Sequence, residues 1–186
     1  MDIFFSAEWM ARQDQEKTPP VLKKLKIHPV QGERAVFVLI EGDTENVRID
    51  LNDRNPAEIF RAIIHDNGKI FEINVDPEDS KRIQMRGEGT LLEGECRGWL
   101  RQKICINHEE KEYQLLRNLL TRSFTLLEEN RKNLGYIRAE SFFSDNYMVE
   151  LPEDFPFSLM LFLSCLGLCD SERPMMPVYD NNWYYH

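Results

Sequence analysis

The stretch Arg97–Ile104 has the residue types of a site for an anionic ligand. Side chains of a strand point alternately to its two faces, which would place one tryptophan and three cations together: Arg97, Trp99, Arg101 and Lys103. An indole ring favours the membrane interface and cations attract anionic headgroups, so this face would suit a lipid surface or another anionic ligand. The alternative is a solvated face on which the indole packs under Arg and Lys stems. Arg131 and Lys132, in a predicted loop, could extend the patch.

Cys165 and Cys169 lie four residues apart, which would place both thiols on one face of a helix. Such a pair could bind a metal ion or form a redox couple. Zinc requires three or four ligands, and the sequence shows no third ligand nearby. The favoured interpretation is therefore that both cysteines are small apolar residues of a core.

The sequence lacks the motifs of the common enzyme classes. We find no glycine-rich phosphate loop, no nucleophile elbow and no zinc-binding His-Glu-x-x-His. His108-Glu109-Glu110 resembles the last of these but has no second histidine in register. We predict no catalytic residue, no cofactor and no bound metal. An enzyme whose site is assembled from residues distant in the sequence is the alternative.

Length and composition indicate an ordinary globular chain of one domain. The 186 residues include 42% hydrophobic and 30% charged residues. A net charge of -9 argues against sequence-independent binding of nucleic acid, which requires neutralisation of phosphates. The N-terminus shows no signal-peptide pattern, and the four cysteines are too scattered for a disulfide framework. We expect reduced thiols and a cytoplasmic location, with peripheral membrane contact if the basic face binds lipid.

The element that must organise the fold is the uncharged run from Phe155 to Cys169. As a helix it would span about 22 Å, which is short of the roughly 30 Å of bilayer hydrocarbon. A helix that is apolar on all sides must be buried on all sides. A single membrane span is therefore disfavoured, and the sequence predicts a sheet wrapped around this helix.

Most of the remaining chain reads as strands. Short candidate strands with turn-prone connections run from residue 90 to residue 151, after earlier strands near 21–27, 34–41, 47–51 and 69–75. Asn55-Pro56-Ala57-Glu58 favours a helix over 55–68, although a hairpin turn at Asp66-Asn67-Gly68 competes with it. We predict an N-terminal arm (1–30), one barrel domain (31–169) with a central helix (155–169), and an aromatic tail (170–186).

The order of elements near the C-terminus is similar to the closing portion of the tubby C-terminal-like superfamily, which includes tubby, the LURP-one-related proteins and the phospholipid scramblases. The matching segments precede the apolar run and are Tyr113–Arg117, Ser123–Leu127, Leu134–Arg138 and Leu151–Pro156. The resemblance covers residues 88–169 and implies an antiparallel β-barrel that encloses a hydrophobic helix. The basic residues that hold phosphoinositides in tubby have no match here, so the resemblance transfers no binding residue.

These observations predict a non-catalytic binding module, because a barrel filled by its own helix has no lumen for a substrate. Its exterior would recognise a protein partner or an anionic ligand. A peripheral binder of phospholipid or phosphoinositide is the second hypothesis, and an enzyme is the third. The candidate ligand-binding residues are Arg97, Trp99, Arg101, Lys103, Arg131 and Lys132.

Overall fold

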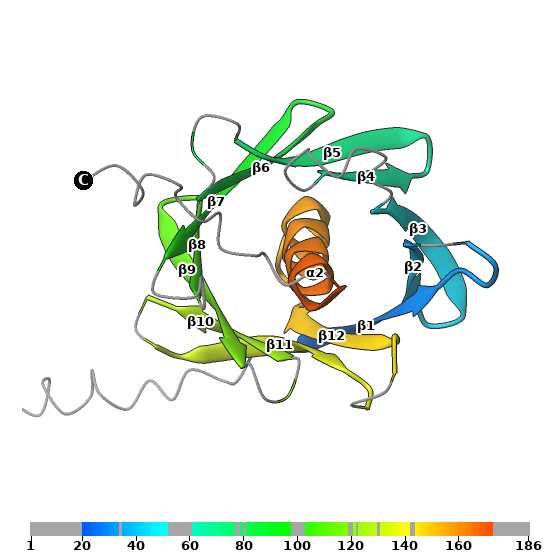
Figure 1. The fold of residues 1–186 in the computed structure, drawn as a ribbon. Helices are drawn as coiled ribbons and strands as arrows, with labels where there is room; N and C mark the ends of the chain where they lie inside the picture. The colour runs from blue at the N-terminus through cyan, green and yellow to red at the C-terminus, as the bar shows by residue number, and fades with distance from the viewer. Residues whose placement is uncertain are drawn as a thin grey trace, which may run out of the picture.

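The computed structural model describes residues 20–33, 35–51, 61–76, 79, 81–97, 103–118, 121, 123–129, 131–141 and 144–172. In this part of the chain, twelve strands form a closed antiparallel barrel around one helix (Figure 1). The predicted fold class, a mainly β protein with a barrel that encloses a hydrophobic C-terminal helix, is therefore confirmed.

Each strand pairs with the next one along the chain, and the first strand closes the barrel against the last. The strands are β1 (Leu22–Pro29), β2 (Val36–Glu41), β3 (Thr44–Asp50), β4 (Arg61–Asp66), β5 (Lys69–Val75), β6 (Arg82–Gly87), β7 (Thr90–Arg97), β8 (Lys103–His108), β9 (Lys111–Asn118), β10 (Ser123–Glu128), β11 (Asn133–Ala139) and β12 (Tyr147–Pro152); the helix is α2 (Phe157–Glu172). The first strand lies within the predicted N-terminal arm but forms part of the barrel wall.

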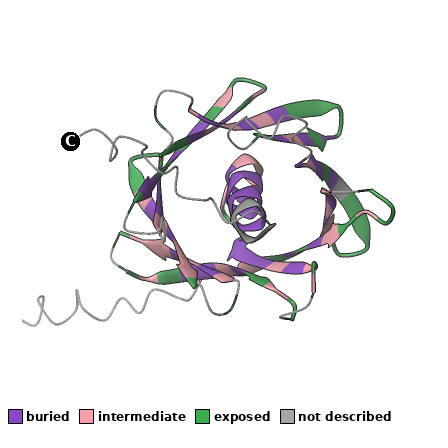
Figure 2. Cartoon of the chain, viewed as in Figure 1, coloured by how far each residue is buried: buried purple, intermediate pink, exposed green. Residues whose placement is uncertain are grey.

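The helix forms the centre of the hydrophobic core. From Leu159 to Leu168 its residues other than Gly167 are at most 2% exposed, and the buried faces of the strands surround it (Figure 2). Burial alternates along several wall strands: in β7, Leu92 and Cys96 are buried whereas Glu93 and Glu95 are exposed. The barrel interior is thus filled by side chains, as the uniformly apolar run requires.

The two ends of the barrel differ. The helix-start end carries the turns that follow β2, β4, β6, β8 and β10 and the link from β12 into α2; the helix-finish end carries the other connections. Three of the described two-residue turns at the helix-start end place both residues at positive φ, as at Asn67 (46°) and Gly68 (85°). That geometry matches the twist of a tight hairpin and suits Asn-Gly.

The predicted helix over residues 55–68 is wrong where the structure describes it, since Arg61–Asp66 is strand β4. Ala62, Ile64 and Asp66 are buried in alternation, which is the period of a strand. The competing hairpin turn at Asn67-Gly68 is confirmed, and residues 52–60 lie outside the described part. A short apolar run fits the period of a helix as well as that of a strand, and pairing with β3 and β5 in the closed barrel makes this segment a strand.

The prediction of one continuous strand through the stretch Arg97–Ile104 is also wrong. Strand β7 continues to Arg97 and β8 begins at Lys103, so the two residues are antiparallel partners on neighbouring strands. Strand β6 was not predicted, because it has only two inward apolar residues, Ile83 and Met85. The predicted strands from 111 to 152 are confirmed to within a few residues.

Candidate functional site

The predicted basic residues do not gather into one patch. Arg97 and Lys103 face each other at the helix-finish end, whereas Arg131 and Lys132 follow β10 at the helix-start end. Trp99, Arg101 and the other residues of 98–102 lie outside the described part. The structure therefore separates the two pairs by the length of the barrel.

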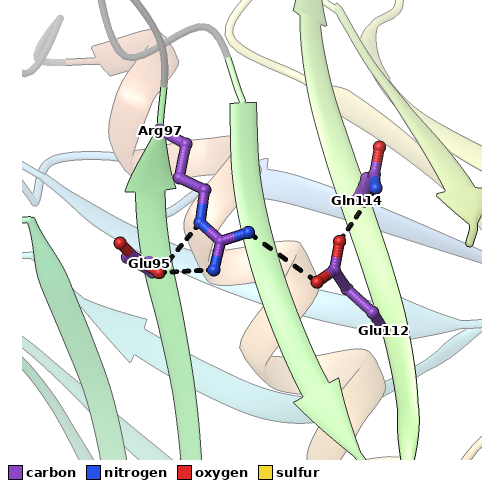
Figure 3. A network of polar contacts seen from close by, with 4 residues as sticks. All are labelled: Glu95, Arg97, Glu112 and Gln114. Carbon is purple, nitrogen blue, oxygen red and sulfur yellow. Dashed lines mark hydrogen bonds and ion pairs between the residues drawn. The ribbon is translucent and has the colours of Figure 1, made fainter.

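Arg97 is engaged by two carboxylates. Its Nη2 lies 2.7 Å from Glu95 Oε2, its Nε donates to the same oxygen at 2.9 Å, and its Nη1 lies 3.7 Å from Glu112 Oε2. Gln114 donates to Glu112 at 2.9 Å, so the network spans β7, β8 and β9 (Figure 3). Hydrogen bonding to Glu95 raises the pKa of Arg97 above its ordinary value. Its positive charge is thus locally compensated, which weakens its attraction for an external anion.

A cavity of about 210 Å³ opens at the helix-start end, between the rim of β8–β11 and the first turn of α2. Its lining combines carboxylates, lysines, aromatic rings and apolar side chains from both wall and helix. These residues are Pro20, His108, Glu109, Lys111, Tyr113, Glu128, Lys132, Leu134, Pro152, Asp154, Phe155, Pro156 and Leu159. One of the predicted ligand-binding residues, Lys132, is among them.

Tyr113 is the most deeply buried polar side chain that lines this cavity. The residue is 5% exposed, and its ring meets that of Phe155 edge to face, with centroids 5.2 Å apart and planes at 68°. Burial raises the pKa of Tyr113, and the charges of Glu128, Asp154 and Glu109 raise it further. Among the described residues, no hydrogen bond to the Tyr113 hydroxyl is present. A phenol hydroxyl on the wall of a cavity, without a partner among the described residues, is a group to which a ligand can hydrogen-bond.

His108 lies beside Tyr113 in the cavity lining, with only a fifth of its side chain exposed. Its Nε2 atom is buried and makes no hydrogen bond within the described part of the chain; Glu109 Oε1 is 3.7 Å away. The sequence had drawn attention to His108-Glu109-Glu110 as an incomplete metal motif. In the described residues, no three His, Cys, Asp or Glu side chains gather in a way that could hold a metal ion.

Most connections at the helix-start end are acidic. Exposed carboxylates occupy most of the connections at this end: Asp43, Glu88, Glu109, Glu110, Glu129, Glu153 and Asp154. Arg131 and Lys132 are the cations in the same connections, as far as the structure describes them. This pattern was available in the sequence, since alternate turns of an up-and-down barrel fall at one end, but only a correct strand count reveals it.

The structure describes the side chain of only one of the two cysteines in the predicted pair. Cys165 is fully buried in the core and its pKa is strongly raised by that burial, which keeps the thiol protonated. The side chain of Cys169 lies outside the described part. Cys165 thus occupies the position of a small apolar residue, as the favoured interpretation predicted.

No helix in the described residues is long and apolar enough to cross a membrane. Comparisons with protein-family models, with curated proteins and with solved structures found no match. The resemblance to the tubby C-terminal-like superfamily therefore stays a prediction.

Proposed function

We propose that this protein is a non-catalytic binding module of the tubby-like type that recognises its ligand at the helix-start end of the barrel. The observation that carries the proposal is the contrast between the filled interior and this end. Helix α2 leaves the lumen packed, whereas the helix-start end has a cavity lined by Tyr113 and by His108, whose buried Nε2 atom lacks a hydrogen-bond partner within the described residues. Such an unpaired buried nitrogen is costly unless a ligand or water satisfies it.

The basic face around Arg97 supports lipid binding less well. Two carboxylates compensate the charge of Arg97, and the second basic pair stands at the other end of the barrel. Binding to an anionic membrane is therefore an outcome that the test must detect, and not the function proposed here.

Methyl NMR of the full chain tests the proposal. The probes are a panel of cationic, anionic and neutral fragments and, in parallel, vesicles with and without anionic lipid. We expect fragments of one charge class to shift the methyl signals of Leu134 and Leu159, which line the cavity. Leu91 and Ile70, exposed on the outer wall, serve as internal controls and should not move.

The proposal is overturned if no fragment shifts the cavity methyls. It is equally overturned if anionic vesicles bind the protein and Lys103→Glu abolishes that binding while the cavity signals stay unchanged.

A further inference from the structure

We infer that this cavity binds the ammonium group of a lysine side chain presented by a basic segment of a partner protein. The inference rests on the proposed function, because it names the ligand of the same site. It is argued from the shape of the cavity, its charge, its free hydrogen-bond acceptors and the charge of the surrounding rim.

The shape of the cavity suits one long side chain. A volume of about 210 Å³ is below the roughly 300–1,000 Å³ of pockets that enclose drug-sized molecules. Tyr113 and Phe155 provide two aromatic walls at a steep angle, and Leu134 and Leu159 add apolar surface. The methylenes of a lysine stem can pack on the apolar walls while its charge meets an aromatic ring.

The charge of the cavity favours a cation. Glu128, Asp154 and Glu109 all line it, and the charged groups that raise the pKa of Tyr113 are these three carboxylates. A potential that disfavours a phenolate favours an ammonium group at the same place. Lys111 is exposed, and Lys132 is half-buried on the rim; their positive charges do not contribute to the shift at Tyr113.

The cavity also offers acceptors that nothing in the described part of the chain uses. Tyr113 is only 5% exposed, and its hydroxyl can accept a hydrogen bond from an ammonium group. The buried Nε2 of His108 can accept a second one when the imidazole is neutral. An ammonium group has three donors, so these two atoms and a carboxylate such as Glu128 could satisfy it completely.

The rim indicates a basic segment and not an isolated amine. The exposed carboxylates continue past the cavity, at Glu88 and Asp43 on distant turns of the same end. Together they would attract further positive charges that flank the inserted lysine and would accelerate the encounter. Binding should therefore weaken as salt concentration rises.

Fluorescence anisotropy of a short labelled peptide of alternating glycine and lysine tests the inference. Peptides with glutamate or norleucine in place of lysine are the comparison probes. We expect binding of the lysine peptide only, and a loss of affinity of about tenfold with Glu128→Gln and with Tyr113→Phe. Asp145→Asn, which removes one exposed charge at the helix-finish end, is the matched control and should leave the affinity unchanged.

A second measurement keeps the test independent of affinity. A water-soluble carbodiimide couples amines to carboxylates, and mass spectrometry should locate the peptide on Glu128, Glu109 or Asp154. Coupling that is distributed over all exposed carboxylates would overturn the inference, as would equal affinity of the wild-type protein and Glu128→Gln.

The probes distinguish a failure of the inferred ligand from a failure of the proposed function. If only the glutamate peptide, or an anionic fragment, shifts the methyls of Leu134 and Leu159, the end of the barrel is a binding site but the inferred ligand is wrong. If no probe of any charge shifts them, both are wrong.

Discussion

Arg97 on β7 reaches across β8 to Glu112 on β9, so that an ion-pair network bridges the outer wall over the strand that carries Cys105 (Figure 3). Cys105 lies in register with Glu95 on one side and Gln114 on the other, between inward-facing Ile104 and Ile106. It is only 3% exposed, yet it is not part of the core cluster. Its side chain therefore faces the outer wall, and we infer that the Arg97 network covers the thiol there.

This relationship predicts that Arg97→Ala increases the reactivity of Cys105 toward a disulfide reagent such as DTNB. Burial raises the pKa of Cys105, and removal of the covering side chain should expose the thiol to the reagent and to water. The rate is measured on the folded protein, and Cys105→Ser in the same background should abolish the increase. Arg61→Ala, which removes the exposed ion pair with Glu72 at 2.7 Å, is the matched control. Equal reactivity of the two arginine variants would show that Arg97 does not shield the thiol.

Helix α2 lies close against the wall at Gly167. A Cβ added there would stand 2.8 Å from Ile137 Cγ2, which is too close for two carbon atoms. We predict that Gly167→Ala lowers the free energy of unfolding by about 1–2 kcal/mol, because overpacking outweighs the better helix propensity of alanine. Urea denaturation measures the change.

The same substitution should change sign when the wall is trimmed. In an Ile137→Ala background, Gly167→Ala fills part of the space left and gains helix propensity, so it should stabilise the protein. Destabilisation by the same amount in both backgrounds would mean that contact with Ile137 is not the cause.

Much of the fold can be predicted from the sequence because it depends on patterns that extend over many residues, and not on the identity of single residues. The helix is predictable from composition, since an uncharged run such as Phe155–Cys169 has to be enclosed. The strands after residue 110 are predictable because turn residues separate them at short intervals. β4 is not, because Ile63 and Ile64 fit a helix as well as a strand, and only pairing with β3 and β5 settles the period.

The candidate site is much less predictable than the fold. Tyr113, Glu128 and Asp154 come from β9, β10 and the link to α2, and closure of the barrel around the helix brings them together. Tyr113 and Phe155 both lie in segments that carry the resemblance, but no spacing pairs their rings. The pattern around Arg97 was visible because it is local, and its ion-pair partner Glu112 was not, since it lies two strands away.

Titration of Tyr113 tests the electrostatics of the cavity directly. Its pKa in the folded protein is raised above 10.0, chiefly by burial, so the unfolded chain ionises first as the pH rises. The stabilisation from the neutral phenol is thus fully present below pH 10 and is lost as the pH rises through the folded pKa. We expect Tyr113→Phe to become progressively less destabilising relative to wild type above pH 10, as measured by urea denaturation at a series of pH values.

Removal of one carboxylate should shift this titration in a known direction. Glu128→Gln should lower the pKa of Tyr113 toward its ordinary value, which is followed by tyrosinate absorbance with Tyr113→Phe as the blank. The matched exposed change, Asp145→Asn, should not affect it. An unchanged titration in Glu128→Gln would mean that Glu128 does not act on the phenol.

The turn beside the cavity is built from residues that are poor for it. Glu109 and Glu110 both have positive φ, 49° and 63°, whereas the turns Asn67-Gly68 and Glu88-Gly89 have glycine second. A side chain in this conformation costs roughly 1 kcal/mol or more. We predict that Glu110→Gly stabilises the protein by about 1 kcal/mol in urea denaturation. Glu110→Ala removes the same charge but keeps the Cβ, so it should give no comparable gain; equal gains would instead indicate repulsion between the adjacent carboxylates. Glu109 lines the cavity and Glu110 does not. Glu110→Gly should therefore remove the conformational cost of the turn without removing a carboxylate from the cavity.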